Sequence, residues 1–422
     1  MKRVILISPY FTPSSLACVL RTRLVASRLA EFGWEPTVVC VDPACYEEPR
    51  DEATLALLPD HLRIERVGAW PSAICRPLGF GDVSLRGQTA LRRRVEELIG
   101  REKFDLIFCT VLPGYTMLVG AWARRQFRLP FVLDYQDPWV QSTAKPALLW
   151  TKAGLAHWLA RKLEPGAVAQ ADALTAVSDA TLDTLRERRL IRAGIPQEVI
   201  PIGADENDHA IAAQAGRSQI PRELGVFQLL YPGTLTDRML PALRAVLLAA
   251  KTLAASGLKL RVHLIGTSAQ PNGTDSLGVG RLVAEIGVSD LVRLEPRRIP
   301  YLDALRTMQD ADALLLLGST DSHYTASKIF PCWLAKKPIL GLFHAASTVT
   351  QLAAELGGVS LVTYDEQAGA ETRIEAVGAA LRGIVERGLA GLPVRNLQAF
   401  EPHSARGVAR AYASLFNRVT AA

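Results

Sequence analysis

The chain has 422 residues, of which 49% are apolar and 21% are charged. This composition excludes a disordered or low-complexity protein, and the length allows two domains that each bury a core. The formal net charge of +6 favours anionic partners, which include nucleotides, acidic lipid headgroups and nucleic acid, without choosing among them.

The N-terminus has two basic residues and then the apolar run Val4 to Ile7, which is too short for the core of a signal peptide. No run approaches the roughly 18 apolar residues of a membrane-spanning helix. The six cysteines show no C-x-x-C spacing, and several lie in apolar runs. We therefore expect a reduced, cytoplasmic protein.

Short apolar runs alternate with helical patterns through the first half. A helix is predicted at residues 21–32, and buried strands are predicted at residues 4–8, 37–41, 106–110, 131–133 and 173–177. Strands that are apolar on both faces and alternate with helices indicate a parallel sheet covered by helices. The first half is thus predicted to be Rossmann-like.

The pattern breaks in a polar, Gly- and Pro-containing stretch near residues 200–222 and then starts again. The second cycle predicts strands at 227–231, 260–265, 292–295, 313–317 and 339–342, and helices at 240–255, 279–286, 301–309 and 327–335. We predict an N-terminal domain at 1–205, a C-terminal domain at 222–400 and a terminal helix at 401–422. The fold class is α/β, with two Rossmann-like, doubly wound domains that face a cleft.

Ligands of doubly wound sheets bind at the carboxyl ends of the strands, and one such loop carries the densest polar signal. Ser327 and Lys328 lie at the predicted start of a helix, with His323 and Tyr324 in the loop before it. Free N–H groups, a hydroxyl and a lysine suit a phosphate. The alternative for His323 is an ordinary structural or exposed loop histidine.

Three other strand ends in the second half carry similar, weaker signals. Gly233 and Thr234 follow one strand, with Arg238 close behind, and Gly266 follows the next. Glycine permits close approach of the backbone to a ligand, and arginine can pair with a phosphate. Arg297 closes a third strand. Each of these is also compatible with an ordinary turn and a solvated arginine.

In the first half, the strand end at 133–139 places two acids beside a glutamine and a tryptophan. Asp137 is the candidate for contact with a hydroxylated substrate or for general base catalysis. Asp134 is compatible with a simple hydrogen bond in a turn.

Other binding chemistries find little support. The pair Asp310 and Asp312 precedes a buried strand and offers too few oxygen ligands for a metal, no Cys/His cluster has zinc spacing, and neither a P-loop nor a clean dinucleotide-binding glycine motif occurs. Residues 145–163 mix tryptophans and leucines with basic residues, which fits a helix on a membrane surface and equally a long helix facing the core.

Taken in order, these motifs resemble one family over nearly the whole chain. The motifs are Ser8-Pro-Tyr-Phe-Thr-Pro13, Asp134-Tyr-Gln-Asp-Pro-Trp139, Ala171-Asp-Ala-Leu-Thr-Ala-Val-Ser178, Ile200-Pro-Ile-Gly-Ala-Asp205, Tyr231-Pro-Gly-Thr234, Tyr324-Thr-Ala-Ser-Lys328 and Lys337-Pro338. The chain is similar to the two-domain glycosyltransferases of the GT-B fold, specifically the group-1, family-4-like enzymes.

The resemblance implies a nucleotide-sugar donor bound mainly by the second domain, an acceptor bound by the first, and transfer without an obligatory metal, with the anomeric configuration retained. By resemblance, Gly233, Thr234, Arg238, Ser327 and Lys328 lie by the diphosphate. Gly266, Arg297 and Tyr324 complete the donor site, with Arg297 near the base. Asp137 and His323 are the implied catalytic residues.

The chain departs from the family at the two positions that usually carry glutamates, which are His323 and Pro331 here. Gln136 stands where a histidine is common. Neither His323 nor Pro331 supplies a carboxylate, so a sugar-nucleotide or glycan-binding protein without activity is the alternative. An epimerase of the same architecture is the third hypothesis, and it would require carboxylates that the second half scarcely offers.

The leading hypothesis is a glycosyltransferase that uses a UDP-sugar or GDP-sugar as substrate, with no separate cofactor and no metal. The expected acceptor is an envelope polysaccharide, a glycolipid or another lipid-linked glycan. We expect no nucleic-acid partner, and a peripheral contact with the inner face of a membrane.

Overall fold

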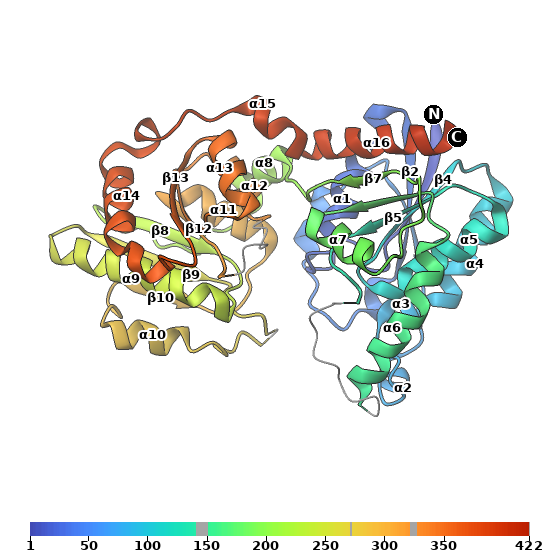
Figure 1. The fold of residues 1–422 in the computed structure, drawn as a ribbon, viewed down its shortest axis with the longest axis horizontal. Helices are drawn as coiled ribbons and strands as arrows, with labels where there is room; N and C mark the ends of the chain where they lie inside the picture. The colour runs from blue at the N-terminus through green and yellow to red at the C-terminus, as the bar shows by residue number, and fades with distance from the viewer. Residues whose placement is uncertain (141–150, 271, 321–326, 422) are drawn as a thin grey trace. The chain divides into compact units, whose positions relative to one another are not determined.

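The computed structural model describes residues 1–140, 151–270, 272–320 and 327–421 (Figure 1). The chain forms two compact units, one made of Met1–Gly203 and Pro402–Ala422 and the other of Ala204–Glu401. The terminal segment predicted at 401–422 is therefore part of the first unit. The stretch between the predicted domains, at 205–222, lies in the second unit and contains a helix, α8 (Glu206–Ala215).

The described residues of the first unit form a seven-stranded sheet in the order β3-β2-β1-β4-β5-β6-β7, with every pair parallel. Its strands are β1 (Lys2–Ile7), β2 (Trp34–Val41), β3 (Arg63–Val67), β4 (Leu106–Thr110), β5 (Phe131–Tyr135), β6 (Ala173–Ala176) and β7 (Gln197–Val199). Every residue of β4, β5 and β6 is buried, as expected of central strands covered on both faces.

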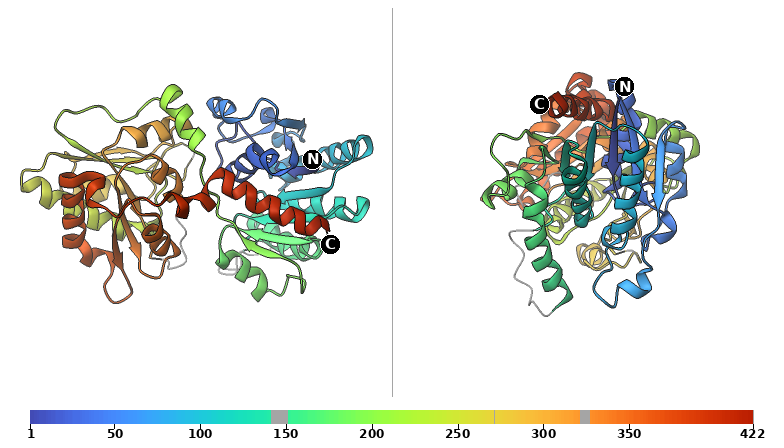
Figure 2. Two further views of the ribbon diagram at one scale, coloured as in Figure 1. Left: turned by 90° about the horizontal axis from the view of Figure 1, so that it is seen from above. Right: turned by 90° about the vertical axis from the view of Figure 1, so that its right-hand side faces the viewer.

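Helices cover both faces of this sheet (Figure 1). They are α1 (Val19–Arg28), α2 (Ser72–Cys75), α3 (Val83–Arg86), α4 (Gln88–Arg101), α5 (Met117–Phe127), α6 (Lys152–Val168), α7 (Asp179–Glu187) and α16 (Ala405–Ala421). Figure 2 shows α16 lying along the first unit, where it packs against α1. Tyr412 and Phe416 of α16 contact Phe108 of β4, with ring centroids 5.3 and 5.9 Å apart.

The second unit has a six-stranded parallel sheet in the order β10-β9-β8-β11-β12-β13. Its strands are β8 (Phe227–Pro232), β9 (Leu260–Ile265), β10 (Val292–Glu295), β11 (Ala313–Leu317), β12 (Ile339–His344) and β13 (Val359–Tyr364). Its remaining helices are α9 (Leu240–Ala255), α10 (Val279–Ile286), α11 (Tyr301–Asp310), α12 (Ile329–Leu334), α13 (Thr348–Leu356), α14 (Ile374–Arg387) and α15 (Leu397–Phe400). The fold class predicted for each half is thus confirmed.

The structure differs from the sequence prediction at the helix expected at 327–335. Helix α12 begins at Ile329, and Ser327 and Lys328 form a turn before it. The helix has only six residues and contains Pro331, which lacks an N–H donor. An anion site at a helix start is therefore a poor description of this segment.

Two other observations bear on sequence expectations. All six cysteines are free, and Cys40, Cys109 and Cys332 are buried. Within the described residues, no helix combines the length and the apolar content needed to cross a bilayer.

A buried ion pair holds the first unit together. The Arg21 Nε of α1 donates to Asp134 Oδ2 of β5 at 3.2 Å, and both side chains are fully buried. The Thr175 and Tyr412 hydroxyls each donate to Asp134 Oδ1 at 2.7 Å. The guanidinium of Arg21 also donates to the carbonyl oxygens of Ile200 and Pro201. Asp134 is thus a structural anion inside the unit and not a turn residue.

We predict that Arg21→Leu lowers the free energy of unfolding by about 3–5 kcal/mol, because it leaves the Asp134 carboxylate buried without its cation. Arg28→Leu, on the same helix, is the matched control. Its half-exposed pair with Glu31, at 3.2 Å, contributes at most about 1 kcal/mol. Urea unfolding followed by circular dichroism measures both, and equal losses would contradict this assignment.

Candidate functional site

The carboxyl edge of the second sheet forms a candidate site within the second unit. The strand order reverses between β8 and β11, and ligands of doubly wound sheets bind at such a switch point. The loops that follow β8, β9 and β10 stay hydrogen-bonded beyond the strands. Gly233 N donates to Ile265 O at 2.7 Å, and Gly266 N donates to Glu295 O at 2.8 Å. The loops therefore form one connected edge.

Lys328 reaches across this edge to the loop after β8. Its Nζ donates to the Thr234 carbonyl oxygen at 3.2 Å and lies 5.4 Å from the centroid of the Tyr231 ring. Gly233 has a φ of +134°, and a Cβ built on it would lie 2.4 Å from Lys328 Nζ. Only glycine fits here, both for its backbone conformation and for the room that it leaves to the lysine.

The charge of Lys328 is poorly compensated. Burial, with a smaller contribution from Arg298, lowers the pKa of its ammonium from 10.5 to about 8. An ammonium has three donors, and among the described residues only Thr234 accepts one, while no described carboxylate lies within ion-pair distance. A desolvated cation without a counterion suits a negatively charged ligand.

Arg298 adds a second positive charge beside Lys328. Its Nη2 lies 3.5 Å from Thr234 Oγ1, and its charge disfavours protonation of Lys328. The sequence prediction named the neighbouring Arg297, whose backbone N–H donates to Glu295 Oε1 at 3.0 Å and whose backbone packs where a Cβ on Gly273 would lie. The sequence does not indicate that Arg298 contacts Thr234, and the role of Arg297 stays a prediction.

The structure places three of the other residues that were predicted to bind the donor, namely Gly266, Arg238 and Ser327. Gly266 is adjacent to Gly233, since a Cβ built on Gly266 would lie 3.7 Å from the Cα of Gly233. The carbonyl oxygen of Arg238 accepts from Thr320 N at 3.0 Å, which joins the loops after β8 and β11. Ser327 is exposed. His323 and Tyr324 lie outside the described residues, so their roles stay predictions.

The first unit has a separate candidate site at the carboxyl edge of its own sheet, after β5. Asp137 is exposed there, yet the surrounding protein withdraws enough water to raise the pKa of its carboxyl group above the ordinary value. Gln136 is buried, and its Nε2 donates to the Cys18 carbonyl oxygen at 3.0 Å. The indole of Trp139 packs directly on Gly114. A Cβ built on Gly114 would lie 2.3 Å from the indole nitrogen.

Glu48 and Tyr10 belong to the same edge, although the sequence prediction did not name them. The Tyr10 hydroxyl donates to Glu48 Oε1 at 2.6 Å. Burial, with smaller contributions from the charges of Glu48 and Asp137, raises the pKa of the Cys18 thiol to about 12. Two carboxylates therefore lie near Cys18. Glu48 carried no sequence signal, because its loop follows the second strand without any motif.

Metal ligands are absent from the part of the chain that the structure describes, where no three His, Cys, Asp or Glu side chains are grouped to hold an ion. Asp312 instead accepts from the backbone N–H of Gln228 at 2.8 Å, and Asp310 pairs with Arg306 at 3.0 Å. These two acids have structural roles at the end of α11 and beside β8.

Comparison with known proteins finds one family model that matches part of the chain. Residues 18–203 match the family model of the glycosyl transferase 4-like domain. No curated protein matches the sequence. The match lies within the first unit, and the chain as a whole has the GT-B fold. The fold predicted from the sequence is thus confirmed, and the predicted family is supported over residues 18–203.

Solved GT-B structures match the chain along its whole length. HepE from Anabaena, in complex with UDP and glucose, has a TM-score of 0.58 at 16% identity, over 100% of this chain and 98% of that one. A UDP-forming α,α-trehalose-phosphate synthase from Burkholderia xenovorans has a TM-score of 0.61 at 12% identity, over 100% of both chains. Sucrose-phosphate synthase from Thermosynechococcus elongatus has 0.56 at 14%, over 100% and 95%. At these identities the similarity concerns the fold.

In this GT-B chain, we predict that Gly233→Ala restores the pKa of Lys328 from about 8 toward its ordinary 10.5. The new methyl group would push the ammonium from its partly buried, desolvated position toward water, where the charged form is favoured. The native Lys328 should therefore lose its proton as the pH rises through about 8, and the variant only at higher pH. NMR titration of lysine side-chain signals measures both.

Gly257→Ala is the matched control. Gly257 also has a positive φ, of +95°, but a Cβ built on it meets no atom within 4 Å. This control carries similar backbone strain without touching Lys328, so its Lys328 should still titrate near 8. An unchanged titration in Gly233→Ala would show that the glycine does not control the position of the ammonium.

Proposed function

We propose that the chain transfers a sugar from a nucleoside-diphosphate sugar to a hydroxyl group of an acceptor. The observation that carries this proposal is the desolvated Lys328 ammonium at the switch point of the second sheet, held over Gly233 and beside Arg298. A diphosphate would supply the missing negative charge. UDP is the first nucleotide to test, because structures of HepE contain it. A GDP-sugar is the other proposed donor.

In the proposed reaction, the bond between the anomeric carbon and the diphosphate oxygen breaks, and a bond from the acceptor oxygen to that carbon forms. Negative charge develops on the leaving diphosphate, so fixed cations placed there stabilise the transition state more than the ground state. Lys328 and Arg298 are the described side chains proposed for this role, with Arg238 as a further cation of the same loops. The nucleoside diphosphate leaves with the electron pair.

The acceptor proton needs a destination, and we propose Asp137. Its carboxylate lies at the carboxyl edge of the first sheet, and its raised pKa makes it a better proton acceptor near neutral pH than an ordinary aspartate. For the anomeric configuration to be retained, the acceptor oxygen would attack from the face that the diphosphate leaves, and its proton would pass to Asp137. His323, implied by the family resemblance to contact the sugar, remains part of this proposal.

The finer features of the reaction are proposals of the same kind. We propose an envelope polysaccharide, a glycolipid or a lipid-linked glycan as the acceptor, retention of the anomeric configuration, and transfer that needs no metal. We also propose a cytoplasmic protein that contacts the inner face of a membrane. The absence of a spanning helix among the described residues is compatible with that contact.

The first experiment is a thermal-shift screen of the intact chain with UDP, GDP, ADP and dTDP. A nucleotide that binds only the folded state raises the melting temperature. We expect one of them to do so, and Lys328→Ala to remove the shift, because it deletes the cation that faces the diphosphate. Lys259→Ala is the control, since this exposed lysine precedes β9 at the opposite edge of the sheet. No shift with any nucleotide would contradict the proposal.

A second experiment separates transfer from binding. We predict that Asp137→Asn lowers the rate of sugar transfer by about 10²- to 10⁴-fold, the usual contribution of a general base, and leaves the Kd for the nucleotide unchanged. Asp183→Asn, an exposed aspartate on α7, is the matched control. Radiolabelled donor and a membrane extract as acceptor source measure transfer. Nucleotide binding without any transfer by the unaltered chain would favour the binding-protein alternative.

A further inference from the structure

An exposed apolar patch lies on the first unit. Of the twelve large hydrophobic residues that are exposed in the described part of the chain, six come from two short segments around α2 and α6. These six, called the apolar patch below, are Trp70, Ile74, Leu78, Phe80, Leu155 and Trp158. Leu78 is 67% exposed, Trp70 64% and Ile74 61%. Such clustering marks an interaction surface, whereas single exposed apolar residues are common.

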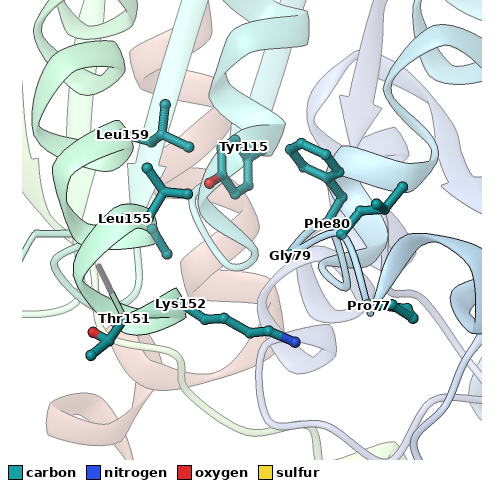
Figure 3. Close-up of a pocket in the computed structure, with 10 residues that line it drawn as sticks. Pro77, Gly79, Phe80, Tyr115, Thr151, Lys152, Leu155 and Leu159 are labelled. Atoms are coloured by element: carbon teal, nitrogen blue, oxygen red, sulfur yellow. The ribbon is translucent and has the colours of Figure 1, made fainter. Parts of the chain in front are cut away.

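The two segments are neighbours in space. They line one groove of about 280 Å³, with Pro77 to Phe80 on one side and Leu155 and Leu159 of α6 on the other. Figure 3 shows Leu155 and Leu159 on one helix, facing Tyr115 and Phe80 across the groove. Leu155 and Trp158 are three residues apart, so they share a face of α6. Three of the six patch residues, Leu78, Phe80 and Leu155, therefore line one groove that joins the two segments.

The charged side chains on the two segments of the apolar patch are all basic. Residues 68–81 and 151–163 contain four basic residues and no acidic residue. Lys152, Arg161 and Lys162 of α6 are exposed, and the Lys152 ammonium lies 3.5 Å from the Arg76 carbonyl oxygen. Arg76 itself pairs with Glu47 at 3.3 Å. An exposed apolar surface bordered by lysine and arginine is complementary to an anionic lipid surface.

We propose that the apolar patch docks the first unit onto an anionic lipid bilayer. Two tryptophans and four other large apolar side chains would enter the interface between headgroups and acyl chains, where tryptophan is favoured. Lys152, Arg161 and Lys162 would contact acidic headgroups. The short α2 and the N-terminal end of α6 enter together, so the contact is peripheral and needs no spanning segment.

The docking surface adjoins the proposed acceptor edge. Tyr115 lines the groove, and its ring packs on Trp139 with centroids 4.9 Å apart. Trp139 is two residues from Asp137. A lipid-linked acceptor in the same bilayer would thus present its hydroxyl group near Asp137, which deepens the proposed function. The docking itself does not rest on the transfer reaction.

Flotation of the intact chain with vesicles tests the proposal. We expect binding to vesicles of phosphatidylglycerol and phosphatidylcholine, and weak binding to phosphatidylcholine alone. The double variant Leu78→Ser with Trp158→Ser should lower the partition coefficient about tenfold or more, because it removes two apolar side chains. Lys152→Gln and Lys162→Gln should each lower it about fivefold at low salt, and added salt should weaken binding by the unaltered chain.

The matched control is Leu224→Ser with Leu397→Ser, which removes two leucines of the second unit that are 89% and 69% exposed. Its vesicle binding should equal that of the unaltered chain. All variants are exposed substitutions, and an unchanged thermal shift with the nucleotide identified above would show that they keep the donor site. This readout separates failure of docking from failure of the proposed transfer.

Three results would overturn the proposal. One is that the unaltered chain fails to float with anionic vesicles. Another is that the patch variants bind as well as the control. The third is a dimer, seen by sedimentation velocity, that the Leu78→Ser and Trp158→Ser variant alone abolishes, because the patch would then join two copies of the chain.

Discussion

The first unit depends on one buried charge. Asp134 is fully buried in the sheet, and such a carboxylate is tolerated only because Arg21, Thr175 and Tyr412 together satisfy it. These partners come from α1, β6 and α16, which are far apart in sequence. The same Arg21 binds the carbonyl oxygens of Ile200 and Pro201, where the chain leaves the unit. The network of Arg21 and Asp134 thus holds two segments in place. One is the stretch at Ile200 and Pro201, where the chain passes to the second unit, and the other is α16, which belongs to the first unit.

This constraint reaches the proposed acceptor edge. Asp134 and Asp137 are three residues apart, one inside the sheet and one beyond its end. Gln136, between them, binds the carbonyl oxygen of Cys18 just before α1 begins, so the loop that carries Asp137 is anchored to the helix that carries Arg21. A structural acid and a candidate functional acid therefore share one short stretch. Their residue type is the same, and burial alone distinguishes them.

The central strands of the two sheets could be predicted well from the sequence, and the edge strand β3 could not. Residues 106–110 and 313–317 match β4 and β11 because these strands are apolar on both faces, which produces a continuous run. The edge strand β3 escaped prediction, since its Arg63 and Glu65 are solvated and break the pattern. For the candidate site, glycines at strand ends could be seen in the sequence. The contact of Arg298 with Thr234 could not, because it joins two loops that are distant in sequence.

Both proposed surfaces hold groups in an environment that is unfavourable for the isolated chain. Lys328 is a desolvated cation beside another cation, and the apolar patch exposes large side chains to water. Neither arrangement stabilises the fold, which instead depends on the sheet cores and on the Arg21 network. A ligand of matching chemistry, anionic in one case and lipidic in the other, would relieve the cost at each surface. The ligand removes this free-energy cost only when it binds. The removed cost therefore adds to the binding free energy, and so to the affinity for that ligand.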